Sequence, residues 1–245
     1  MFHSRWFGLM LGVAAALAPA PALAIPTLQL NTSGGTYDTT TETIVAPGTS
    51  FTLYAYLSPD EGNALADTYY ISAAVAPSIG PAAGAYGSFT FDGVVTQITT
   101  DMIYGTPPLE EALAETDPGD IASHGIYETY FREFAFTFSE ANRTNAFDTM
   151  EAPGQTPAPY TGTGPSMYWA AFTVDTSGVD PSYRIHFDLY NAALASSTGD
   201  VDITQFAPFS HDAESGLPPA IPEPGTLCLA AGGALALLAR ARRRS

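Results

Sequence analysis

Apolar and polar residues alternate along this chain in segments as long as a β-strand, and this pattern constrains the fold most. In residues 51–58, Phe51, Leu53, Ala55 and Leu57 share one face, as in a strand with one buried side. Similar segments are found at residues 68–75, 88–97, 133–139, 167–176 and 183–190. Turn-forming residues separate these segments. We therefore predict an all-β fold, an antiparallel β-sandwich of the jelly-roll or Ig-like type.

One segment departs from the alternation and favours a helix. Thr106 is a suitable N-cap, Pro107 stands at a position that tolerates proline, and Leu109 and Leu113 are four residues apart. We expect a short surface helix over residues 107–115 that covers one end of the sandwich.

The N-terminus has the pattern of a secretory signal peptide. Arg5 precedes an apolar stretch at residues 7–17, and Ala22 and Ala24 form a small-x-small cleavage site. We expect signal peptidase to remove residues 1–24 and the exported chain to begin at Ile25.

The C-terminus combines a proline motif, an apolar run and a basic tail. The residues of the motif and the tail are Pro222, Glu223, Pro224, Arg240, Arg242, Arg243 and Arg244. Residues 225–239 predict a transmembrane helix, although at about 1.5 Å per residue they are short for a bilayer core of roughly 30 Å. The arginines favour the cytoplasmic side and so place the body of the protein outside the cytoplasm.

This order of Pro-Glu-Pro, apolar helix and basic tail resembles the PEP-CTERM sorting signal. The resemblance implies that an exosortase sorts and cleaves the chain in the envelope of a Gram-negative bacterium, which places the product at the cell surface or outside the cell. The chain then divides into a β-sandwich ectodomain at 25–210, an exposed linker at 211–221 and the sorting signal at 222–245. The membrane is a partner only through the C-terminal helix before processing.

The body of the chain also resembles a known group of ectodomains. The similar segments are residues 28–30, 34–38, 51–54, 70–73, 87–91, 104–110 and 207–213. Together they resemble the choice-of-anchor N group, whose ectodomains occur on PEP-CTERM and other anchors. The resemblance implies an anchored ectodomain and carries over no activity.

The charge of the body excludes some partners. Residues 25–221 contain three arginines and twenty-four acidic residues, a formal charge of −21, compared with −17 for the whole chain. Such a domain repels nucleic acid and other polyanions. The single cysteine, Cys228, lies in the apolar run, so disulfides, thiol catalysis and thiolate metal sites are excluded from the body.

The sequence predicts no catalytic residue. The histidines of the body, His124, His186 and His211, are far apart, and neither His-Glu-x-x-His nor Gly-x-Ser-x-Gly occurs. We therefore expect a protein that is not an enzyme. One alternative stays open, a secreted polysaccharide hydrolase that uses paired carboxylates or histidines that converge in the fold.

Two strands carry candidate ligand faces. In residues 183–190 alternation places Arg184, His186 and Asp188 opposite an apolar face, either as a solvated row of charges or as a polar groove for a ligand. Tyr54 and Tyr56 likewise share a face, where they either stack on sugar rings or pack at the rim of the core.

Asp200 and Asp202 are the candidate metal ligands. They occupy alternate positions in a polar turn, as carboxylates do at the start of calcium loops. The complete calcium-loop pattern is absent, so a solvated turn is the alternative, and no other cofactor is indicated.

We conclude from the sequence that this is an exported cell-surface or matrix protein with a structural or interaction role in the envelope or biofilm. A glycan-binding module, with or without calcium, is the first alternative, and extracellular polysaccharide is its partner. The hydrolase is the second.

Overall fold

The computed structural model describes residues 25–81, 84–105, 128–194 and 201–217. The predicted signal peptide, the helix predicted at 107–115, His124, Asp200 and the predicted sorting signal lie outside these ranges. None of the described residues belongs to a helix with the length and hydropathy needed to cross a membrane.

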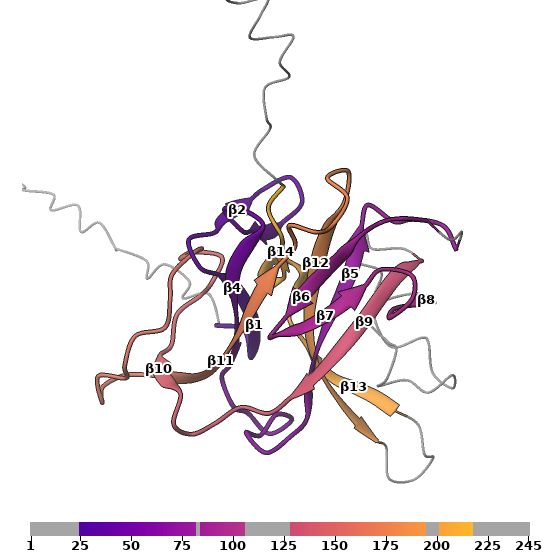
Figure 1. Ribbon diagram of the computed structural model, residues 1–245. Helices are drawn as coiled ribbons and strands as arrows, with labels where there is room; N and C mark the ends of the chain where they lie inside the picture. The colour runs from indigo at the N-terminus through magenta and orange to yellow at the C-terminus, as the bar shows by residue number, and fades with distance from the viewer. Residues whose placement is uncertain (1–24, 82–83, 106–127, 195–200, 218–245) are drawn as a thin grey trace, which may run out of the picture.

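The described residues form two packed β-sheets without an α-helix (Figure 1). The first sheet has the order β1 (Leu28–Thr32), β4 (Ser50–Leu57), β11 (Ser166–Asp175), β6 (Ser88–Phe91) and β7 (Val94–Gln97), with β10 (Arg143–Asn145) also paired to β11. The second has the order β2 (Thr36–Asp38), β3 (Thr43–Val45), β14 (Ala213–Glu214), β12 (Arg184–Leu194), β5 (Tyr69–Ala76), β9 (Thr129–Phe136) and β8 (Ile103–Gly105), with β13 (Val201–Phe206) also paired to β12. The predicted all-β sandwich is confirmed.

Two details differ from the prediction or stay open. β14 pairs with β3 in parallel, so the sheets are not purely antiparallel. The choice between a jelly-roll and an Ig-like topology remains a prediction. A single 3₁₀ turn, η1 (Phe209–His211), precedes β14.

The core lies between the two sheets. Alternate side chains of β4 form part of it. Leu53, Ala55 and Leu57 are fully buried, and each faces the second sheet because side chains two apart in a strand share a face. Phe187 of β12 meets Phe51 of β4 edge-on, with 6.1 Å between the ring centroids. Aromatic contacts of this kind join the sheets.

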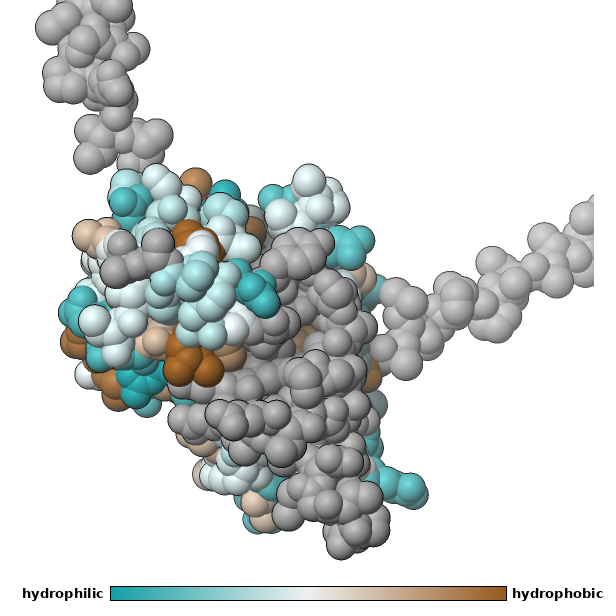
Figure 2. Space-filling model, turned by 90° about the vertical axis from the view of Figure 1, so that its right-hand side faces the viewer, coloured by the Kyte–Doolittle hydropathy of each residue, from teal (hydrophilic) through white to brown (hydrophobic). Residues whose placement is uncertain are grey.

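The surface has the opposite character. On the face seen in Figure 2, hydrophobic residues occupy small separate areas among hydrophilic ones, as expected of an acidic domain that contacts water.

The strand predicted over residues 88–97 is wrong at its centre. Asp92 and Gly93 form a tight turn between β6 and β7, and both have positive φ angles, 46° and 82°. An Asp-Gly pair between two alternating segments is typical of a two-residue hairpin turn. The sequence therefore contained the signal for this hairpin.

Gly87 provides a test of the packing between β6 and the loop before β12. Its φ is +86°, and a Cβ there would overlap the carbonyl oxygen of Gly178, which accepts a hydrogen bond from the N–H of Ser88. We expect Gly87→Ala to lower the free energy of unfolding by about 2–3 kcal/mol, because backbone strain and steric overlap add. Urea denaturation measures the loss.

Gly93→Ala is the matched control for this substitution. Its φ is +82°, but the space around it is open, so we expect a loss of only about 1 kcal/mol from strain. Equal losses in the two variants would contradict the overlap at Gly178.

Candidate functional site

β12 and the segment that ends in β14 bring four ionisable side chains together on the outer face of the second sheet. On β12, Ile185, Phe187 and Leu189 belong to the core between the sheets, so His186 and Asp188 point the other way. Glu214 of β14 lies opposite His186 in the strand register, and Asp212 comes two residues earlier. We call His186, Asp188, Asp212 and Glu214 the His186 cluster.

The imidazole of His186 lies at the centre of the cluster. Its Nε2 atom is 3.3 Å from Oδ1 of Asp188 and 3.3 Å from Oδ2 of Asp212. Its Nδ1 atom is 3.9 Å from Oε2 of Glu214. The other carboxylate oxygen of Glu214, Oε1, accepts a hydrogen bond from Nη1 of Arg184 at 2.6 Å. Carboxylates therefore lie near both ring nitrogens.

The interpretation of Arg184, His186 and Asp188 as a solvated row of charges is wrong. His186 is 4% exposed and Asp188 is fully buried, whereas the Arg184 side chain is 34% exposed. Alternation assigns residues to faces of a strand, but it does not show whether the second face is covered. Here β12 is buried on both faces at His186 and Asp188.

Burial and charge oppose each other in the pKa values of the cluster. Burial alone would lower the pKa of His186, but the charge of Asp188 and hydrogen bonds to Asp188, Asp212 and Glu214 raise it well above its ordinary value. Burial raises the pKa of Asp212. It acts in the same direction on Glu214, but hydrogen bonds from His186 and Arg184 hold that pKa below its usual value. The cluster therefore stabilises positive charge around the imidazole.

Sequence reasoning missed half of this cluster, because Asp212 and Glu214 lie in the segment predicted as an exposed linker. That prediction is wrong for residues 211–216, whereas Leu217 is exposed as expected. His211, Asp212, Ala213, Glu214 and Ser215 are all buried, and β14 completes the second sheet. A two-residue strand whose partners are distant in the sequence leaves no periodic signal.

The other described histidine has different partners. Nε2 of His211 is 3.0 Å from Oδ1 of Asp148, and its Nδ1 is 2.8 Å from Oγ of Ser210. His186 and His211 thus contact separate sets of side chains.

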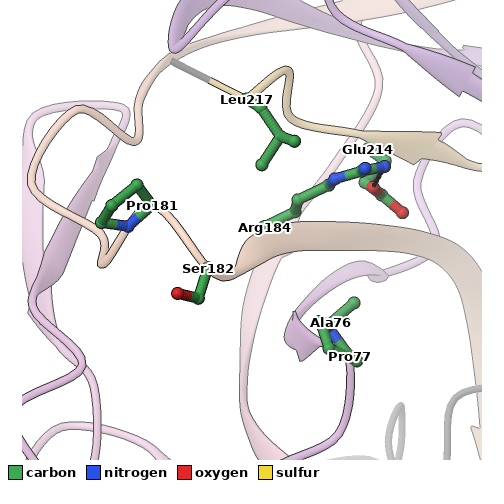
Figure 3. Close-up of a pocket in the computed structure, with 7 residues that line it drawn as sticks. All are labelled: Ala76, Pro77, Pro181, Ser182, Arg184, Glu214 and Leu217. Carbon is green, nitrogen blue, oxygen red and sulfur yellow. Dashed lines mark hydrogen bonds and ion pairs between the residues drawn. The ribbon is translucent and has the colours of Figure 1, made fainter. Parts of the chain in front are cut away.

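A pocket adjoins the cluster at Arg184 and Glu214 (Figure 3). Its volume is about 470 Å³, and it is lined by Ala76, Pro77, Pro181, Ser182, Arg184, Glu214 and Leu217. Figure 3 shows the guanidinium of Arg184 beside the carboxylate of Glu214. The pocket therefore touches the cluster at Glu214, the member that is paired with Arg184.

Of the two tyrosines predicted to share a ligand face, Tyr54 is partly exposed and Tyr56 is not. Tyr56 is fully buried under the segment 147–155, where its ring meets Phe147 edge-on at 5.1 Å. Asn31 of β1 holds this segment in position, because its Oδ1 accepts a hydrogen bond from the N–H of Gly154 at 2.8 Å. The prediction of an exposed Tyr56 is wrong, while Tyr54 is half-buried beside Trp169, with 6.2 Å between the ring centroids.

A second pocket, which we call the Trp169 pocket, opens next to these rings. It has a volume of about 450 Å³ and is lined by Ala141, Arg143, Pro157, Ala158, Pro159, Tyr160 and Trp169. The guanidinium carbon of Arg143 lies 4.2 Å from the centroid of the Tyr160 ring, and its Nε donates to Oγ of Ser166 at 2.9 Å. Sequence reasoning missed this pocket because its walls come from β10, β11 and the irregular segment between them.

The calcium prediction is only partly addressed by the structure. Asp202 belongs to β13 and not to a polar turn, which corrects that assignment, and Asp200 lies outside the described residues. Calcium binding by these two residues stays a prediction.

Residues 220–244 match the PEP-CTERM protein-sorting motif. Neither a curated protein nor a solved structure is significantly similar to the chain. The motif identifies an exported protein that an exosortase sorts to the cell surface in Gram-negative bacteria, and the β-sandwich is its ectodomain.

Proposed function

We propose that this protein is a non-enzymatic surface or matrix protein of the choice-of-anchor N type, which binds neutral extracellular polysaccharide through the Trp169 pocket. Signal peptidase removes residues 1–24, and the exosortase cleaves the chain near Pro222, Glu223 and Pro224. The helix at 225–239 is therefore a transient membrane anchor. The observation that carries the binding function is the aromatic lining of this open pocket.

Aromatic side chains suit a sugar ligand. Trp169 and Tyr160 are half-buried, so each offers ring surface to a partner, and such rings combine a large apolar face with a polar edge. Arg143 is exposed and is oriented by Tyr160 and Ser166, so its N–H groups are available to sugar hydroxyls. The strongly acidic body disfavours a polyanion, which leaves neutral polymers as the preferred ligands.

The linings of the two pockets support a role without catalysis. Hydrolysis of a glycosidic bond uses two carboxyl groups that face each other across the substrate. The pocket beside the His186 cluster is lined by one carboxylate, Glu214, which is already paired with Arg184. No carboxylate lines the Trp169 pocket.

Replacing Trp169 with alanine tests the binding function. We expect the affinity for neutral polysaccharides to fall by about tenfold or more, because stacking and buried area are lost together. Affinity electrophoresis and titration calorimetry with dextran, galactomannan and xyloglucan would measure this loss, with alginate as the acidic comparison.

Val95→Ala is the control, because Val95 is 57% exposed on β7 and lines neither pocket. Its affinity should stay within about twofold of the original chain, as expected of a surface substitution. An original chain that binds none of the neutral polymers, or an unchanged affinity in Trp169→Ala, would refute the proposal.

A further inference from the structure

We propose that His186, Asp188 and Asp212 form a binding site for a divalent transition-metal ion, with Zn²⁺ as the best match. The ligand atoms of these residues all lie within 4.8 Å of one another, and all three residues are buried. This site is independent of the Trp169 pocket and of the proposed polysaccharide ligand.

The spacing of the three side chains suits a shared ion. Nε2 of His186 is 3.3 Å from a carboxylate oxygen of Asp188 and from one of Asp212. Charge-assisted N–H···O hydrogen bonds are shorter, about 2.7–2.9 Å. Two ligand atoms that bind one tetrahedral ion with bonds of about 2.0–2.1 Å are separated by about 3.3 Å. The spacing of the cluster therefore matches that of ligands around one metal ion.

The charges of the cluster call for a cation. Asp188, Asp212 and Glu214 carry three carboxylates, and Arg184 contributes one positive charge. When the imidazole is neutral, as a metal ligand must be, these groups sum to −2. A divalent ion neutralises that sum.

Asp212 supplies a second and separate observation. The residue is 3% exposed, and among the described residues its Oδ1 atom has no hydrogen-bond donor. Its Oδ2 atom is the one near His186. A buried carboxylate oxygen that lacks a donor is expensive, and the charge of a cation bound to the same carboxylate offsets that cost.

The groups around the ligands resemble the support that metal-binding histidines receive. Nδ1 of His186 faces Glu214, and Glu214 is held by Arg184. A carboxylate at the far ring nitrogen fixes the tautomer in which the other nitrogen binds the metal. Glu214 is thus a positioning residue for His186.

The donor set discriminates between ions. Imidazole nitrogen with carboxylate oxygen suits zinc and similar transition metals. Calcium takes six to eight oxygen ligands, whereas the carboxylates of Asp188 and Asp212 offer at most four. We therefore expect zinc to bind well ahead of calcium and magnesium.

Titration calorimetry with metal ions tests the site. The full chain, purified in a mild detergent and stripped with a chelator, is titrated separately with ZnCl₂, CoCl₂, MnCl₂ and CaCl₂. We expect one Zn²⁺ ion per chain with a dissociation constant of about 1 μM or below, and calcium at least about 100-fold weaker. Co²⁺ should give the visible absorption of a tetrahedral site.

Substitutions distinguish the proposed metal ligands from Glu214, which positions His186. His186→Ala and Asp188→Asn should weaken zinc binding by at least about 100-fold, whereas Glu214→Gln should retain one ion with about 10–100-fold lower affinity. Asp175→Asn, at an exposed strand end, is the matched control and should bind like the original chain. If the ligand variants fail to fold, the zinc affinity of Glu214→Gln tests the proposal in their place. Weak binding of several ions, equal affinity for calcium, or unchanged binding in His186→Ala or Glu214→Gln would overturn the proposal.

Discussion

Replacing Phe187 with alanine is expected to lower the free energy of unfolding by about 3–5 kcal/mol, the range for a large buried aromatic residue. Phe187 is fully buried, and its ring lies 6.1 Å from that of Phe51 and 6.3 Å from that of Phe91, both in the other sheet. Its loss leaves a cavity where the sheets meet. Guanidinium denaturation followed by tryptophan fluorescence measures the change.

The surface residue Val95 is again a useful comparison. Val95→Ala removes apolar volume from an exposed side chain and should change stability by less than about 0.5 kcal/mol. If Phe187→Ala cost no more than this control, the sheets would not be packed around Phe187 as described.

Zinc is expected to stabilise the chelator-treated protein by about 2.7 kcal/mol at a free concentration one hundred times its dissociation constant. The reason is linkage, because the folded chain brings β12 and the start of β14 together and the unfolded chain does not. Denaturation with and without ZnCl₂ measures the gain. Hydrogen exchange should show that protection increases at residues 213–215.

His186→Ala is the decisive comparison for this result. The variant lacks the central ligand, so zinc should leave its stability unchanged within about 0.5 kcal/mol. An equal gain in the variant would mean that zinc stabilises the chain from another position.

The sequence predicted those parts of the fold that depend on local pattern. The alternation in residues 51–58 and 183–190 correctly assigned Leu53, Leu57 and Phe187 to the core, since a strand has only two faces. The sorting motif at 220–244 was equally readable, because a short run of neighbouring residues defines it. The Asp92-Gly93 hairpin was missed even though its signal was local.

The candidate sites were not predictable in the same way, because they depend on contacts between distant segments. Tyr56 is buried by a segment about ninety residues later in the chain. Asp212 meets His186 only because β14 pairs with β12. A polar residue on the second face of a strand looks the same in the sequence whether water or protein covers it.

The position of β14 gives the end of the ectodomain a role in the timing of its folding. β14 is the last described strand, yet it lies inside the second sheet, where it pairs with β3 on one side and β12 on the other. An exported chain that crosses the membrane from its N-terminus delivers residues 213–214 late, shortly before the sorting motif. The second sheet therefore cannot be completed until the residues just before the sorting motif are available to pair with β3 and β12.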